Sequence, residues 1–283
     1  MTSQPGSMTL HEAAEALGVH YMTAYRYVRL GQLEARKVGG TWQVAETDLR
    51  SFQTRPPVLS GDRQSAPWAQ RLEHRLVAGD ANGAWGVIEA ALSGGSDVEE
   101  IYLDVVSPAM SSIGERWSLG ELDVAVEHRA SVIVTRLLGR IGHRFARRGR
   151  SKGTVVLGAP SGEFHALPVA MVADLVRQNG WEVSDLGADV PPLSFVHTAK
   201  EVDDLVAVGL SVTMESSLGA LQESLGALRQ GVNPDALLIV GGRAIRDHDH
   251  AVVLGADAYA ADGRSFGVVL DGFVARGGAV SAG

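Results

Sequence analysis

A glutamate and a histidine separated by one residue are suited to binding a metal ion. Glu163 and His165 follow the apolar run 154–157, in a loop that begins after Gly158. Neutral imidazole is a good ligand for transition-metal ions, and a nearby carboxylate can orient its ring. A lone histidine in a loop is more often an ordinary surface residue, so the interpretation depends on what accompanies it.

Two other loops contain residues that favour a ligand site. Ser211 and Thr213 stand at the end of a later apolar run, and Gly241 and Gly242 follow the next one. Glycines allow a flat or elongated ligand to approach the backbone closely. Ligands of open parallel sheets bind at the carboxyl ends of the strands, so we expect these loops and the histidine loop to meet.

The elements that must position these residues have the pattern of a doubly wound parallel sheet. Short apolar runs alternate with stretches of helical periodicity. The expected strands are 154–157, 181–186, 206–212, 236–240 and 256–259. We therefore expect residues 151–283 to form a flavodoxin-like, Rossmann-like α/β domain.

The preceding segment, residues 68–150, predicts a four-helix bundle. Ser96 and Glu99 have the spacing of a capping box that opens a helix, and Asp123 is placed to cap a longer one. Two earlier helices are expected near Leu72 and Ile88. The chain is thus predicted to be a multidomain α and α/β protein.

Residues 1–55 have the pattern of a winged helix-turn-helix domain. Gly18 suits the tight turn between two helices, and Gly39-Gly40 lies between two β-prone pieces that predict a hairpin wing. The residues expected to contact DNA are Tyr21, Thr23, Arg26, Arg29, Arg36 and Lys37. The alternative is a small interaction module whose arginines are only solvated.

Composition narrows the function classes. The chain of 283 residues has no cysteine, which excludes disulfides, cysteine-ligated metal centres and thiol nucleophiles. Its net charge of −8 argues against a surface coated in basic patches, although a small DNA-binding module on an acidic partner domain stays possible. No apolar run approaches the roughly 20 residues that span a bilayer, and the first residues lack the apolar region of a signal peptide. We expect a soluble, cytoplasmic protein without membrane contact, in which residues 56–67 form a linker.

Residues 8–52 resemble the excisionase-type helix-turn-helix domain, which is related to MerR domains. The matching residues are Thr23-Ala24-Tyr25-Arg26, the turn from Gly31 to Leu33, Gly39-Gly40-Thr41-Trp42 and Asp48-Leu49. The resemblance implies operator DNA as a partner.

The sheet segment resembles the cobalamin-binding domain with the signature Asp/Glu-x-His-x-x-Gly, Ser-x-Leu and Gly-Gly. The resemblance implies that His165 replaces the cofactor's own base as the lower cobalt ligand, with Glu163 as its nearby acid. It further implies that the pocket for the displaced nucleotide tail is lined by Ser211, Thr213, Gly241 and Gly242. Thr213 itself stands where the signature often has Leu, and Pro168 stands where it has Gly, so the shape of these loops departs from the pattern.

The three segments in this order resemble CarH/LitR-type light-sensing repressors. Trp117, Glu127 and His128 have the Trp-x9-Glu-His spacing of that family. The resemblance implies a helical cap in which the Trp packs against the upper ligand of adenosylcobalamin and the Glu accepts from its adenosyl group, while His128 contacts the ligand or a subunit interface. The alternative places Trp117 in the bundle core and leaves Glu127 solvated at a helix N-terminus. Ser118 replaces the His that often follows the cap Trp, so the identity of the upper cobalt ligand after illumination stays open. Whether a non-covalent bilin also binds stays open too.

This resemblance implies a switch. In the dark, adenosylcobalamin favours an oligomer, a tetramer in the family, that holds operator DNA; light breaks the cobalt–carbon bond and releases the DNA. Two other functions stay open: a cobalamin-sensing regulator without a light role, and a corrinoid carrier for methyl transfer. The sequence shows no catalytic acid–base pair or hydrolase triad, so we do not expect an enzyme.

Overall fold

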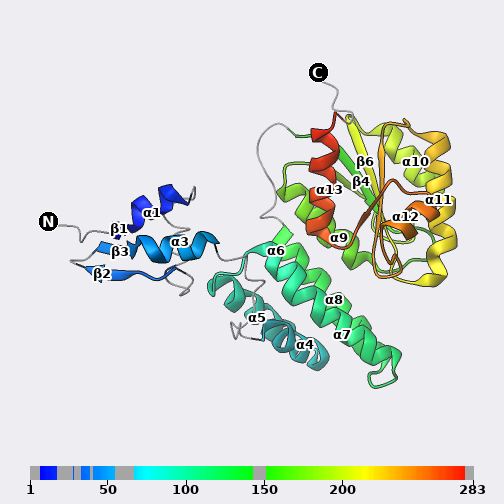
Figure 1. The fold of residues 1–283 in the computed structure, drawn as a ribbon. Helices are drawn as coiled ribbons and strands as arrows, with labels where there is room; N and C mark the ends of the chain where they lie inside the picture. The colour runs from blue at the N-terminus through cyan, green and yellow to red at the C-terminus, as the bar shows by residue number, and fades with distance from the viewer. Residues whose placement is uncertain are drawn as a thin grey trace. The chain divides into compact units, whose positions relative to one another are not determined.

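The computed structural model describes residues 7–17, 28, 33–38, 41–54, 67–142 and 151–277. The chain divides into two compact units, Met1–Ser65 and Ala66–Gly283, and each is considered by itself (Figure 1). Four of the predicted DNA contacts fall outside the described residues: Tyr21, Thr23, Arg26 and Arg29. All of the predicted linker except its last residue also falls outside them.

In the residues that the structure describes, the first unit packs two helices against a small antiparallel sheet. Its described elements are β1 (Ser7–Thr9), α1 (Leu10–Ala16), β2 (Arg36–Val38), β3 (Thr41–Ala45) and α3 (Glu46–Thr54), with strand order β1-β3-β2. Helix α1 begins where Thr9 and Glu12 exchange hydrogen bonds between side chain and backbone, as in a capping box. The hairpin of β2 and β3 is the predicted wing, whereas β1, paired with β3, was not predicted.

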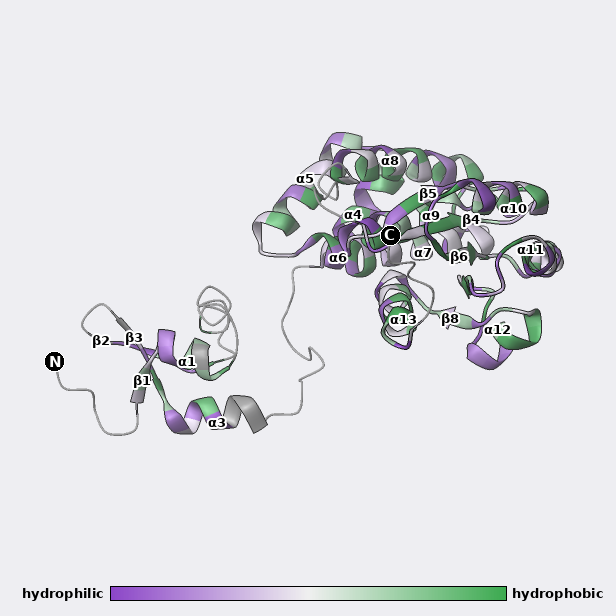
Figure 2. Cartoon of the chain, turned by 90° about the horizontal axis from the view of Figure 1, so that it is seen from above, coloured by the Kyte–Doolittle hydropathy of each residue, from purple (hydrophilic) through white to green (hydrophobic). Residues whose placement is uncertain are grey.

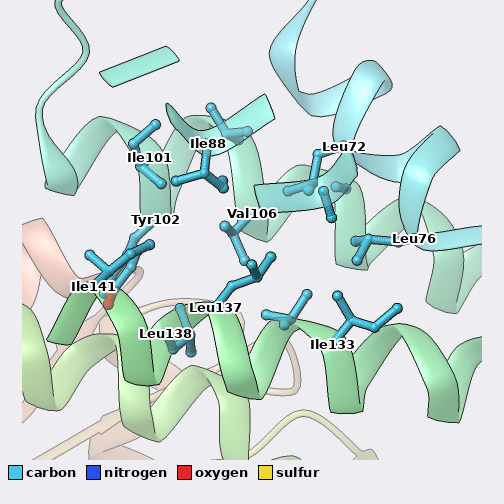
Figure 3. Packing of buried hydrophobic residues seen from close by; sticks show 14 of the residues in the cluster. Leu72, Leu76, Ile88, Ile101, Tyr102, Val106, Ile133, Leu137, Leu138 and Ile141 are labelled. Carbon is cyan, nitrogen blue, oxygen red and sulfur yellow. The ribbon is translucent and has the colours of Figure 1, made fainter. Parts of the chain in front are cut away.

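The second unit begins with helices that share one apolar core. They are α4 (Trp68–Ala78), α5 (Ala81–Ser93), α6 (Val98–Glu100), the π-helical η1 (Ile101–Val106), α7 (Ser107–Ser118) and α8 (Val124–Gly142). Segments α6, η1 and α7 follow one another without a break, so they act as a single long helical rod. Figure 3 shows leucines and isoleucines of α4, α5, η1 and α8 pointing toward one another in this core.

The capping box lies one residue later than predicted. Asp97, not Ser96, is the N-cap of α6, and its partner is Glu100 rather than Glu99. Because Asp97 takes the capping position, Glu99 falls on the outside of the first turn, where it pairs with Arg264 at 2.6 Å. Asp123 accepts from the backbone N–H of Ala125 at the start of α8, close to the predicted helix start.

A five-stranded parallel sheet forms the rest of the second unit. Its strands are β4 (Thr154–Gly158), β5 (Glu182–Asp185), β6 (Leu205–Ser211), β7 (Leu237–Gly241) and β8 (Ala258–Ala260), each overlapping a predicted one. The order β5-β4-β6-β7-β8 is the flavodoxin-like order, so the predicted α/β fold class is confirmed.

Helices cover the sheet and bury its inner strands. They are α9 (Ala166–Gln178), α10 (Pro192–Glu201), α11 (Leu218–Gly231), α12 (His248–Leu254) and α13 (Gly263–Ala275), with a short 3₁₀ turn, η3 (Glu215–Ser217), before α11. Strands β4 and β6 are buried over most of their length and carry the hydrophobic colour in Figure 2, as expected for parallel strands covered on both faces. No helix in the described part of the chain is both long and apolar enough to cross a bilayer.

The helical part is joined to the sheet part through η1 and α9. The hydroxyl of buried Tyr102 donates to a carboxylate oxygen of Asp174 at 2.8 Å, and Leu175 belongs to the helical core. Burial, and then the bond to Asp174, raise the pKa of Tyr102, while burial also raises the pKa of Asp174. With the ion pair of Glu99 and Arg264, these contacts attach the start of the helical rod to the sheet domain.

Candidate functional site

The buried carboxylate of Glu163 connects two loops at the carboxyl edge of the sheet. Strand β4 ends at Gly158, and the loop after it brings the fully buried Glu163 beneath the loop that follows β6. The backbone N–H groups of Thr213 and Met214 donate to one oxygen of Glu163, at 2.7 and 2.9 Å. Such bonds compensate the loss of hydration of a buried carboxylate, so Glu163 is a fixed structural part of this edge.

The imidazole of His165 is oriented by the other oxygen of Glu163. His165 is the N-cap residue of α9, its ring Nδ1 is hydrogen-bonded to Glu163, and its backbone N–H donates to the same oxygen at 3.2 Å. Among the described residues no hydrogen bond reaches Nε2, and the side chain is 43% exposed. Because Nδ1–H faces the carboxylate, the neutral ring has its lone pair on Nε2, the form in which histidine binds a metal ion.

The two charges stabilise one another. Burial by itself raises the pKa of Glu163, but the hydrogen bonds from His165 and from the amides of Met214 and Thr213 outweigh burial and lower it to about 2. The bond to Glu163 also raises the pKa of His165 above its ordinary value. Glu163 is therefore ionised at neutral pH and can hold the histidine ring in one orientation.

The two glycines after β7 are required by the packing of the edge itself. Gly241 stands in register with Ser211, at the ends of neighbouring strands β7 and β6. A Cβ added at Gly241 would lie 2.4 Å from the carbonyl oxygen of Ala260, and one added at Gly242 would lie 2.3 Å from that of Val212. Gly242 also has φ +95°, which side chains rarely tolerate. Glycine is thus needed here whether or not a ligand approaches.

The surroundings of Trp117 and Glu127 differ from the alternative in which Trp117 lies in the bundle core and Glu127 is solvated. Trp117, near the end of α7, is 42% exposed and so is not part of the buried core. The Glu127 carboxylate is only 20% exposed; one oxygen accepts from the hydroxyl of Ser131 at 2.8 Å, and the other contacts Nδ1 of His128 at 2.6 Å. His128 is itself 73% exposed. Glu127 is therefore held by two side chains and is not freely solvated.

Charged groups of the helical part and of the turn after β7 act on His165 at the sheet edge. The carboxylate of Glu127 helps to raise the pKa of His165, after the larger effect of Glu163, and the guanidinium of Arg243 opposes them. The start of α8 and the turn after β7 therefore both lie near the histidine. The charges of Glu127 and Arg243 therefore both act on His165.

Some residues of this edge were not singled out from the sequence. Asp189, at a positive φ of 56°, accepts from the backbone N–H of Gly162 at 2.8 Å and so fixes the histidine loop. The apolar side chains of Phe164 and Met214, next to residues of the site, are 74% and 47% exposed. An Asp in a Gly-rich turn is a recognisable sign of left-handed backbone, but the backbone amide of Met214 carries no signal in the sequence.

The remaining predicted residues lie on the other unit. Arg36 and Lys37 are exposed on β2, in the hairpin with β3, and Trp42 packs partly buried against the small core of that unit. These two cations stand on the wing, and their contact with DNA phosphates stays a prediction.

Surface hollows also occur away from the histidine. One of about 680 Å³ lies between α4 and α5, and one of about 530 Å³ lies beside Asp235 and Asp257. Neither is lined by a residue of the Glu163–His165 edge.

Comparison with known families accounts for most of the described chain. Residues 153–266 match a family described as B12 binding domain, and residues 68–141 match a second family with the same description. Residues 7–56 match a helix-turn-helix domain. The chain therefore combines B12-binding domains with an N-terminal helix-turn-helix domain, as predicted.

Curated relatives are corrinoid proteins of low identity. Trimethylamine corrinoid protein 1 of Methanosarcina acetivorans is 28% identical over 176 residues, 61% of this chain and 81% of the relative. Dimethylamine corrinoid protein of Methanosarcina barkeri is 26% identical over 194 residues, 68% of this chain and 90% of the relative. The solved monomethylamine corrinoid protein of Methanosarcina barkeri superimposes with a TM-score of 0.64 at 19% identity, covering 72% of this chain and 97% of that one, which shows a shared fold.

These comparisons support a cobalamin cofactor. The matches describe a cofactor-binding part and a DNA-binding part, and the curated relatives are named as corrinoid proteins.

Proposed function

We propose that this protein is a light-responsive transcriptional repressor that uses adenosylcobalamin and binds operator DNA as a dark oligomer. The observation that carries the proposal is the union of a helix-turn-helix domain with B12-binding domains in one chain, in which Trp117 is exposed and Glu127 is held near His165. Adenosylcobalamin supplies a cobalt–carbon bond that light breaks.

The residues at the sheet edge fit a corrinoid. His165 presents a lone pair on Nε2 that suits the lower face of cobalt, while Glu163 holds the ring through Nδ1. The exposed Phe164 and Met214 offer apolar contacts to a large flat ring. Ser211 and Thr213, with Gly241 and Gly242, line the proposed tail pocket.

The helical part is proposed as the cap over the upper face. The indole of Trp117 provides an aromatic wall, and the carboxylate of Glu127 accepts hydrogen bonds from ribose hydroxyls of the adenosyl group. Ser131 and His128 hold that carboxylate, so it is oriented before a ligand arrives. Joining several helix-turn-helix domains in one oligomer then raises the affinity for DNA, and loss of the oligomer removes that gain.

A corrinoid carrier is the second candidate, because the curated relatives are corrinoid proteins. Such a carrier would have no use for a helix-turn-helix domain, which this chain has. The two candidates also differ in their ligand, since a methyl carrier favours methylcobalamin and the proposed cap favours adenosylcobalamin.

Size-exclusion chromatography with in-line absorbance tests the proposal. The protein is loaded in the dark with adenosylcobalamin or with methylcobalamin, and each sample is run before and after green light. We expect a large coloured species with adenosylcobalamin alone, which becomes smaller on illumination. A coloured species whose size does not change on illumination would refute the light switch, and preference for methylcobalamin would favour the carrier.

Variants of the cap sharpen the test. Trp117→Ala and Glu127→Ala should each weaken the adenosyl-dependent oligomer while cobalamin stays bound through His165. Glu115→Ala, at an exposed position of the same helix as Trp117, is the matched control and should oligomerise normally. Normal oligomers of both cap variants would overturn the cap assignment.

A further inference from the structure

Arg243 is an exposed cation on the turn that follows β7. The backbone N–H of Ile245 donates to the carbonyl of Gly242 at 3.0 Å, which closes a tight turn with Arg243 at its first corner. Ala244 and Ile245 are buried, at 7% and 3% exposure, while Arg243 is exposed. The packing of the turn therefore directs this one side chain of the three outward.

This turn is attached to the same edge as the histidine. The N–H of Ala244 donates to the carbonyl of Val212 at 3.1 Å, and the next residue, Thr213, donates to Glu163. One chain of backbone hydrogen bonds thus links the Arg243 turn, the end of β6 and the Glu163–His165 pair. The positive charge of Arg243 acts to lower the pKa of His165.

The charge of Arg243 stands out against its surroundings. Apart from His165, the titratable groups named at this edge are carboxylates: Glu163 and Asp189 in neighbouring loops, and Glu127 at the start of α8. In the described part of the chain, no hydrogen bond or ion pair joins Arg243 to any of them. A guanidinium without a partner can bind an anionic group on a ligand, and its planar fork suits phosphate oxygens.

We propose that Arg243 binds the phosphodiester that links a cobalamin to its nucleotide tail. This inference rests on the proposed cobalamin site and adds a residue to it. The tail carries a single negative charge, and near so many carboxylates it needs a cation. Arg243 therefore selects corrinoids that carry the nucleotide over those that lack it.

The test compares two ligands and four proteins. Equilibrium binding of hydroxocobalamin and of cobinamide, which lacks the nucleotide and its phosphate, is followed by visible absorbance for wild type, Arg243→Gln, Arg243→Lys and Arg246→Gln. Arg246 is an exposed arginine three residues further on and serves as the matched control. Melting curves of the ligand-free variants check that folding is unchanged.

We expect Arg243→Gln to weaken binding of hydroxocobalamin by about five- to tenfold, as for loss of one charge-assisted bond at an exposed site, and to leave cobinamide binding within about twofold. Arg243→Lys should retain most of the affinity, and Arg246→Gln should match wild type. Equal binding of hydroxocobalamin by Arg243→Gln and wild type would overturn this inference alone, as would an equal loss for both ligands. A wild-type protein that binds neither ligand would overturn the cobalamin site itself.

Discussion

Replacing the buried Glu163 by glutamine tests the core of the site. The charge of Glu163 is stabilised in the folded protein, because its pKa falls from 4.5 to about 2. That difference corresponds to about 3 kcal/mol of folding free energy at neutral pH, since each pKa unit is worth about 1.4 kcal/mol. We expect Glu163→Gln to lose about this much, which for a domain of this kind is a large share of its stability.

The same substitution also alters the histidine. If the oxygen of the new amide accepts from Thr213 and Met214, its NH₂ group faces Nδ1 of His165. Nδ1 must then accept a hydrogen bond, and the neutral ring carries its proton on Nε2, where it blocks the metal-binding lone pair. In the opposite orientation the NH₂ group faces two backbone N–H groups, and buried donors lose their acceptor. Either orientation harms folding or ligation.

Two measurements separate these effects. Urea unfolding of the ligand-free protein gives the change in folding free energy, and the visible spectrum with bound hydroxocobalamin reports whether a histidine occupies the lower face. Glu215→Gln is the control and should behave as wild type, because Glu215 is an exposed glutamate just after the loop of Thr213 and Met214. Unfolding of Glu163→Gln within about 0.5 kcal/mol of wild type, together with an unchanged spectrum, would refute the reasoning.

Three further perturbations address pH, the joint and the glycine turn. The stability that Glu163 contributes is complete above pH 4.5 and is lost as the pH falls toward about 2, because its folded-state pKa lies below 4.5. In urea titrations, wild type should therefore lose more stability than Glu163→Gln between pH 5 and pH 3. Equal losses would contradict the assignment. Tyr102→Phe keeps the apolar ring but removes the bond to Asp174, so urea unfolding should show a loss of about 1–2 kcal/mol, and no loss would show that this bond does not stabilise the joint. Gly242→Ala should lower the folding free energy by about 2 kcal/mol or more, because φ is positive and the new Cβ meets Val212. Gly255 also has a positive φ but faces open space, so Gly255→Ala should be clearly less destabilising in thermal melts. Equal destabilisation by the two substitutions would argue against the clash.

The sequence predicted the fold well because its signals are local. Strands β4, β6 and β7 are short apolar runs that end in Gly or Ser, and such runs are easily recognised. The pairing of Glu163 with His165 was also predictable, since the two residues lie two positions apart in one loop. The wing was predictable from the paired glycines at 39 and 40.

The features that the sequence did not predict depend on residues far apart in the chain, or on which of two adjacent residues caps a helix. Strand β1 has three residues, and its partner β3 lies more than thirty residues away, so no local pattern marks it. Both Ser96 and Asp97 can cap a helix, and each has a glutamate three residues on, so the sequence does not choose between them. The amides that bind Glu163 belong to the backbone and are invisible in a list of side chains.

The attachment of the helical rod bears on how the proposed cap could respond to its ligand. The contacts of Glu99 and Tyr102 with the sheet domain lie at the start of the rod 98–118, whereas Trp117 lies at its end. A helix of this length spans about 30 Å, so the two sets of residues are far apart along it. The start is fixed by an ion pair, a buried hydrogen bond and shared apolar packing, while Trp117 is exposed. A ligand held between Trp117 and the His165 edge would therefore add a second attachment to the sheet domain at the far end of the rod, and its loss would leave the attachment at the start.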